Sequence, residues 1–100
     1  MNLQITQTPD SVMAQLDGRL DTASAAQFTL DMQPLMDNAH KHIILDCASL
    51  EFISSSGLRL FLSLRKESLA KGGSVTIRNI TPEVKQVFTI TGFFSLFNFE

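Results

Sequence analysis

The chain has no tryptophan or tyrosine, three prolines and a single cysteine among its 100 residues. Because Cys47 is alone, it cannot form an internal disulfide or a thiolate metal site, so stability must come from packing and no metal is expected. No apolar run approaches the roughly 18–20 residues of a membrane span, and the polar start lacks the pattern of a signal peptide. These absences predict a cytoplasmic protein with no membrane partner.

Charge is also scarce, with eight Lys and Arg, ten Asp and Glu, and a formal net charge of −2. A slightly acidic chain without long blocks of one sign has no field that attracts a phosphate backbone, so nucleic acid is not an expected partner. A length of 100 residues is enough for one compact core, and we expect one domain over residues 1–100. A substrate cleft between two domains is thereby excluded.

Alternation of apolar and polar residues predicts an N-terminal hairpin, with strands over residues 2–6 and 12–16. Asp21 is placed to cap a first helix, because its short acceptor side chain can satisfy free N–H groups. Pro34 falls inside the helical pattern, where it removes a donor and its ring collides with the preceding turn. The prediction is therefore one helix with a distorted last turn.

Strands and helices are predicted to alternate along the rest of the chain. The apolar run 42–46 suits a central strand covered on both faces, which Asp46 closes, and a further strand is expected over 74–78. Helical spacing follows each of these strands. Helices between successive strands imply right-handed crossovers. The expected fold class is α/β, with a mixed sheet of four to five strands, an N-terminal hairpin and helices packed against the sheet.

Three hydroxyl side chains, those of Ser54, Ser55 and Ser56, stand where a strand end becomes a helix start. The first N–H groups of a helix are unpaired and carry about half a positive charge, so this position suits an anion. Serine is among the best N-cap residues, and capping alone is the plainer explanation of the run. The functional hypothesis is that one of the three serines is phosphorylated.

Four segments in this order resemble the STAS domain, in particular the bacterial anti-sigma factor antagonists. They are Leu16–Asp21, Ile44–Asp46, Phe52–Leu58 and Val87–Phe93. The resemblance covers nearly the whole chain and implies a mixed sheet with helices against it. It also implies a switch that binds a cognate anti-sigma factor, itself a serine kinase, and releases it on phosphorylation. A serine phosphatase resets such a switch.

The resemblance places the phosphoacceptor two residues before the glycine of the motif, at Ser55. Relatives usually carry an aspartate immediately before the acceptor, where this chain has Ser54, so Ser54 and Ser56 compete for the role. The partner-binding surface that it implies includes Gly57 and places Asp46 beside the kinase-facing side.

The helix that follows the serines has two apolar faces when its residues are placed about 100° apart. The face expected to be buried comprises Leu58, Phe61, Leu62, Arg65 and Leu69. Leu60 and Leu64 lie nearly opposite, and Arg59 and Lys66 form a basic rim between the two faces. We expect Arg59, Leu60 and Leu64 to extend the partner-binding surface, although scattered exposed leucines are common in folded proteins.

Other functions remain as alternatives to the switch. One is a non-switching STAS scaffold or transporter-associated regulatory subunit, in which Ser55 only caps; another is a small nucleotide-binding module, although the P-loop glycines and lysine are absent. A hydrolase using Ser55, His40 or His42, and Asp46 is disfavoured, because Ile53 stands where the nucleophile elbow needs glycine. We expect no enzyme, no cofactor, and a monomer or weak dimer.

All eight aromatic residues are phenylalanine, and five of them follow residue 87. Four of these follow the last predicted helix, namely Phe93, Phe94, Phe97 and Phe99. We expect them to close the core as a short final segment and Phe94 to be the most exposed of the four.

Overall fold

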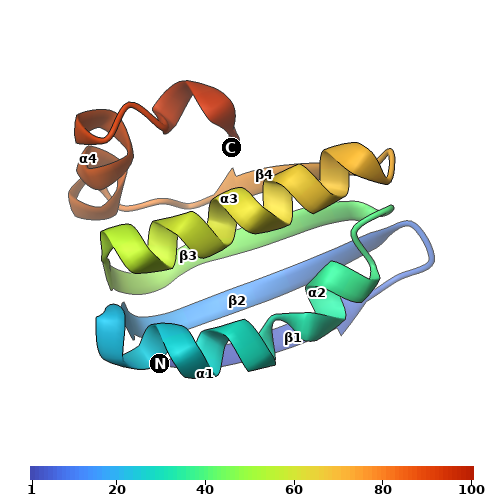
Figure 1. Cartoon of the computed structure of the whole chain (residues 1–100), viewed down its shortest axis with the longest axis horizontal. Coiled ribbons are helices and arrows are strands. Elements are labelled where there is room, and N and C mark those ends of the chain that lie inside the picture. Colours follow the sequence, from blue (N-terminus) through green and yellow to red (C-terminus); the bar gives the residue numbers. More distant parts are fainter.

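The computed structural model of the chain describes residues 1–100 and has one mixed sheet with helices packed against it (Figure 1). The strands are β1 (Asn2–Gln7), β2 (Ser11–Leu20), β3 (His42–Ile53), β4 (Ser74–Arg78) and β5 (Asn98–Phe99). The helices are α1 (Thr22–Asp31), α2 (Gln33–Asp37), α3 (Ser55–Ala70) and α4 (Pro82–Ile90), and a single 3-10 turn, η1 (Phe94–Leu96), precedes β5. The predicted α/β class is confirmed.

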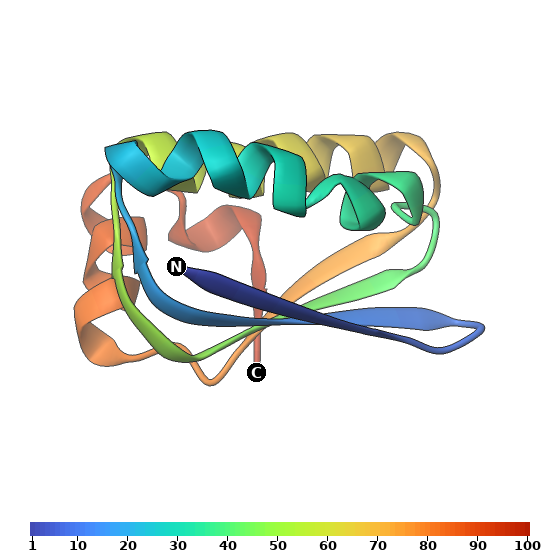
Figure 2. The same ribbon diagram turned by 90° about the horizontal axis from the view of Figure 1, so that it is seen from below.

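The strands lie in the order β1-β2-β3-β4-β5, so neighbours in sequence are neighbours in the sheet. β1 and β2 pair antiparallel as the predicted hairpin, and the three other pairs are parallel. Each parallel pair requires a crossover, and right-handed crossovers that advance in one direction place their helices on the same face. Figure 2 shows the result: α1, α2 and α3 cover one face and leave the other open.

Burial along β3 therefore alternates. Ile43, Leu45 and Cys47 face the helices and are fully buried, whereas Ile44 and Asp46 on the open face are half-buried. The prediction of a strand covered on both faces is wrong, and so is its end at Asp46, because β3 continues to Ile53. Burial, and secondarily the nearby Asp46 charge, raises the pKa of the Cys47 thiol to about 12, so the thiol stays neutral.

Pro34 divides the first helical segment into two helices. α1 ends at Asp31 and α2 begins at Gln33, with Pro34 in the first turn of α2, where no N–H is needed. The single distorted helix of the prediction is thus replaced by a break at Met32. None of the helices is long and apolar enough to cross a membrane.

A chain of phenylalanine rings joins the helices through the core. Phe61 of α3 lies 6.2 Å from Phe28 of α1 and 6.2 Å from Phe88 of α4, measured between ring centroids. Phe88 in turn meets Phe97 and Phe99 edge-on, each at 5.6 Å. The late phenylalanines close the core as predicted, and Phe94, at 38% exposure, is the one left at the surface.

The central position of Phe61 in this chain gives a stability prediction. We expect Phe61→Ala to lower the free energy of unfolding by about 3–5 kcal/mol, because it removes a fully buried ring and leaves a cavity. Urea denaturation measures the loss. Ile90→Ala is the control, since Ile90 is 75% exposed, and should cost less than about 0.5 kcal/mol. Equal losses in the two variants would contradict the assignment of the core.

Candidate functional site

Two helix starts lie side by side at one edge of the sheet. β2 and β3 run parallel, with Leu20 opposite Ile53, so the segments that leave them meet at the same edge. The Ser54 backbone N–H donates to the Leu20 carbonyl at 2.8 Å and ties the two segments together. Figure 1 shows α1 and α3 both starting at this end of the molecule. The serine run therefore lies next to the start of α1.

The three serines have different environments at the start of α3. Ser54 is the N-cap, with extended backbone angles, and its hydroxyl accepts from the Gly57 N–H at 3.1 Å. Ser55 is the first helical residue and its side chain is exposed, whereas Ser56 is half-buried. Ser54 thus performs the capping role, and the Ser55 hydroxyl faces solvent without a hydrogen-bond partner in the protein.

Gly57 allows α3 to approach β2 more closely than any other residue could. A Cβ atom at this position would lie 2.6 Å from Leu20 Cγ and 3.0 Å from the Leu20 carbonyl oxygen. Real Cβ atoms essentially never approach another atom as closely as 2.6 Å, so a side chain here would push α3 away from β2. The glycine therefore determines how closely the first turn of α3, with its serines, packs against the end of β2.

The start of α1 is held by a capping box. The Asp21 carboxylate accepts from the Ser24 N–H at 2.9 Å, and the Ser24 hydroxyl accepts from the Asp21 N–H at 3.0 Å. The bond from the Ser24 N–H, then the Ser24 hydroxyl, and to a lesser degree the Arg19 charge, lower the pKa of Asp21. The capping role predicted for Asp21 is confirmed.

Arg19 and Phe52 form a further pair at this edge that the sequence reasoning missed. They are opposite each other in the register of β2 and β3, and the Arg19 guanidinium lies 4.5 Å from the centroid of the Phe52 ring. A cation this close to a ring face is held by the quadrupole of the ring. The parallel pairing of the two strands was the available signal, because it brings residues before both helices together.

Leu64 does not belong to an exposed surface. It is 1% exposed, and Leu60 is half-buried against the core, so the docking role predicted for Leu64 is wrong. The reason is that α3 packs against α1 and α2 as well as against the sheet, so its second row of apolar residues is covered by these two helices. Conversely, Leu69 was expected inside and is 58% exposed. Of the predicted docking residues on the helix, Arg59 is exposed next to the serines.

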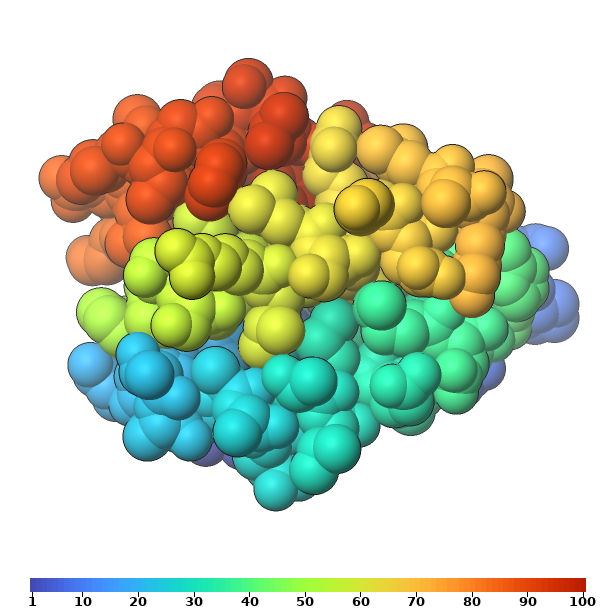
Figure 3. Space-filling view, viewed as in Figure 1, coloured from blue at the N-terminus to red at the C-terminus, as the bar shows by residue number.

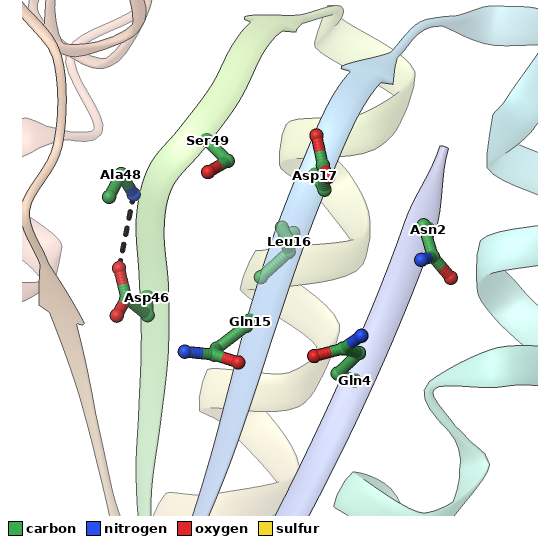
Figure 4. A pocket seen from close by; sticks show the side chains of 8 residues that line it. All are labelled: Asn2, Gln4, Gln15, Leu16, Asp17, Asp46, Ala48 and Ser49. Carbon is green, nitrogen blue, oxygen red and sulfur yellow. Dashed lines mark hydrogen bonds between the residues drawn. The ribbon is translucent and has the colours of Figure 1, made fainter.

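Asp46 lies on the open face of the sheet and is not brought to the serine run. Its carboxylate accepts from the Ala48 N–H at 3.1 Å and from the Asn79 side-chain amide at 3.4 Å. It borders a polar hollow of about 180 Å³, which is also lined by Gln15 and Asp17 of β2 and by their register partners Gln4 and Asn2 of β1 (Figure 4). In Figure 4 α3 runs behind the sheet, so this hollow and the helix layer lie on opposite faces.

The histidines are also remote from Ser55. His42 begins β3 and its Nδ1 pairs with the Ser74 hydroxyl, whereas Ser55 follows the other end of this strand. His40 is exposed on the connection before β3. These residues therefore do not form a catalytic triad, and no cluster of three or more histidine, cysteine or acidic side chains has metal-binding geometry.

The contact between Gly57 and Leu20 generates a test. Gly57→Ala should lower the free energy of unfolding by about 1–3 kcal/mol, because the new methyl group collides with Leu20. In a Leu20→Ala background the same change should cost at least about 0.5 kcal/mol less, because the side-chain part of the clash is gone. Thermal or urea unfolding of the four proteins measures this coupling. Strictly additive losses would show that the contact does not constrain α3.

The capping carboxylate predicts a pH dependence. Because the folded-state pKa of Asp21 is lowered, its contribution to stability is present above its unfolded pKa and is lost as pH falls through the folded pKa. Asp21→Asn keeps a capping acceptor but removes the charge. The unfolding free energy of the wild type should exceed that of the variant above about pH 5, and the difference should shrink as pH falls toward about 2. A difference that does not change with pH would contradict this role.

Comparison with known proteins identifies relatives that match nearly all of this chain and most of their own length. BtrV of Bordetella bronchiseptica is 31% identical over 97% of this chain and 84% of its own length. The anti-sigma F factor antagonist of Paenibacillus polymyxa is 28% identical over 96% of this chain and 85% of its own. The solved structure of the anti-sigma factor antagonist SpoIIAA in its unphosphorylated form has a TM-score of 0.81 at 26% identity. It covers 99% of this chain, and 88% of the SpoIIAA chain is matched.

The family model described as the STAS domain matches residues 2–100. The match includes the hairpin, the four parallel strands and both helix starts at the sheet edge. The chain belongs to the STAS domain family.

Proposed function

We propose that this protein is an anti-sigma factor antagonist and that phosphorylation of Ser55 switches its binding to an anti-sigma factor with serine kinase activity. A serine phosphatase would restore the binding form. Relatives that carry the antagonist name support the first part, and SpoIIAA is also known in a phosphorylated form, with a TM-score of 0.73 to this chain at 25% identity. The protein would act by binding, in the cytoplasm, and not as an enzyme.

The exposed hydroxyl of Ser55 is the observation that carries the proposal. A kinase needs a serine whose hydroxyl is accessible and not already engaged. Ser54 uses its hydroxyl to cap α3, and Ser56 is half-buried, so Ser55 is the best acceptor of the three. This supports Ser55 over its two competitors even though Ser54 replaces the aspartate usual in relatives.

A phosphate on Ser55 would leave the fold intact. It adds about −1.5 to −2 charges at pH 7, and the N-terminus of a helix favours such a charge by about 0.3–1 kcal/mol. The Ser54 cap and the Gly57 contact do not involve the Ser55 side chain, so they would persist. The effect would therefore fall on a partner that docks over this helix start and must desolvate the phosphate.

The docking surface is centred on the start of α3. Exposed Ser55 and Arg59 lie one turn apart on this helix, and exposed Lys66 continues its basic side. Leu60 contributes a half-buried apolar contact. Asp46 lies on the open face of the sheet and is left out of the surface, as is buried Leu64.

The test compares two acidic variants on the same helix. Ser55→Asp should weaken binding to the anti-sigma factor by at least about tenfold, because it places a charge at the docking centre. Ser63→Asp, also exposed on α3, should change the affinity less than about twofold. Isothermal titration calorimetry with the purified anti-sigma factor measures both dissociation constants.

Phosphorylation itself is followed by mass spectrometry after incubation with the kinase and ATP. The wild type and Ser54→Ala should each gain one phosphate, and Ser55→Ala should gain none. Phosphate on Ser54 or Ser56 would reassign the acceptor. An unphosphorylated wild type, together with tight binding by Ser55→Asp, would favour a non-switching scaffold and refute the proposal.

A further inference from the structure

Most positive charges of this chain already have a partner. Six of the eight lysine and arginine side chains contact a carboxylate, a backbone carbonyl or an aromatic ring, namely Arg19, Lys41, Arg65, Lys71, Arg78 and Lys85. The other two, Arg59 and Lys66, are exposed on α3, and their side chains make no hydrogen bond or ion pair. The first turns of α3 therefore carry a free guanidinium.

No acidic side chain of α3 lies next to Arg59. Neighbours on a helix surface are three or four residues apart. At these spacings the neighbours of Arg59 are Ser55, Ser56, Leu62 and Ser63. Glu67 is the one acidic residue of α3, and it is paired with Lys71 at 3.0 Å, about two turns away from Arg59. Arg59 thus has hydroxyl groups but no carboxylate among its neighbours on the helix.

A phosphate on Ser55 would supply the missing anion. The Cβ atoms of residues four apart on a helix are about 5–6 Å apart, a distance that an arginine side chain spans. Ser55 and Arg59 are both exposed, and the hydroxyl that caps the helix is that of Ser54. In Figure 3 the yellow-green start of α3 lies open on the helix face, next to the blue and cyan start of α1. The planar guanidinium can bond two phosphate oxygens at once.

Arg59 is the cation best placed for this pair. Lys66, the other free cation, lies eleven residues after Ser55, which is about 16 Å along the helix. Arg19 belongs to the same edge of the sheet, but its guanidinium is held 4.5 Å from the centroid of the Phe52 ring. The surroundings of a phosphate on Ser55 are therefore expected to depend on Arg59 and not on Lys66.

We propose that a phosphate on Ser55 forms an ion pair with Arg59 and so removes this guanidinium from the docking surface. The inference rests on the proposed phosphorylation of Ser55. In the unmodified protein Arg59 is free to contact an acidic group of the anti-sigma factor, whereas after phosphorylation the phosphate holds it. The partner then meets an added negative charge and loses a positive one at the same turn of α3. A single modification thereby reverses the local charge.

The test uses the full chain with phosphoserine incorporated at position 55 during synthesis, so it needs neither the kinase nor the anti-sigma factor. ³¹P NMR measures the pKa of the phosphate. A guanidinium favours the dianion over the monoanion and lowers this pKa. Arg59→Gln should therefore raise it, with about a twofold fall in the acid dissociation constant, and Arg59→Lys should restore part of the difference. Lys66→Gln is the matched control, since it removes the other exposed, unpaired charge of α3, and should leave the phosphate pKa unchanged.

Thermal unfolding gives a second readout. The phosphate should raise the Tm more in the wild type than in Arg59→Gln, because only the wild type forms the ion pair. Equal phosphate pKa values or equal changes of Tm in these two proteins, or an equal change of pKa in Lys66→Gln, would overturn the proposal. A phosphate that leaves the affinity for the anti-sigma factor unchanged would refute the proposed function and not the ion pair. Lost affinity without a difference in phosphate pKa would refute the ion pair alone.

Discussion

The close approach of Gly57 to Leu20 is the constraint on which the proposed site depends. Only a hydrogen atom fits between the first turn of α3 and the end of β2, and the Ser54 N–H bond to the Leu20 carbonyl holds the same two segments together. These contacts with Leu20 hold the start of α3 against the end of β2. In this position the Ser54 hydroxyl caps the helix and the Ser55 side chain is exposed to solvent. The site is therefore rigid without using the hydroxyl that it presents.

The strand order explains why the helices, and with them the two helix starts, lie where they do. Parallel strands that advance in one direction place their crossover helices on one face, so α1 and α3 pack side by side and start at the same edge. The phenylalanine rings of α1, α3 and α4 then fill the space between the helices and the sheet. The proposed site and the hydrophobic core are built from the same helices and strands, but the serine surface itself contributes little to the packing of the core.

Local signals in the sequence were sufficient for much of this structure. Asp21 and the serine run act through neighbouring backbone groups, so their caps could be predicted from the residues alone. Pro34 indicated a distortion of the first helix, but the complete break into α1 and α2 was not predicted. The family resemblance supplied the proposal that Ser55 is the phosphoacceptor.

Features that depend on distant segments were not predictable in the same way. Leu64 is buried because a second helix packs beside α3, which helical periodicity on a single element does not reveal. Asp46 faces away from the serines because β3 continues past it on a sheet with one open face. The stacking of Arg19 on Phe52 arises from strand register, which sequence spacing does not fix.

The most direct test of a switch at a rigid helix start uses the protein with phosphoserine incorporated at position 55 during synthesis. Its affinity for the anti-sigma factor and its two-dimensional NMR spectrum are compared with those of the unmodified chain. The account predicts an affinity lower by at least about 100-fold, with shifts confined to the starts of α1 and α3. Unchanged affinity, or shifts spread through the core, would contradict it.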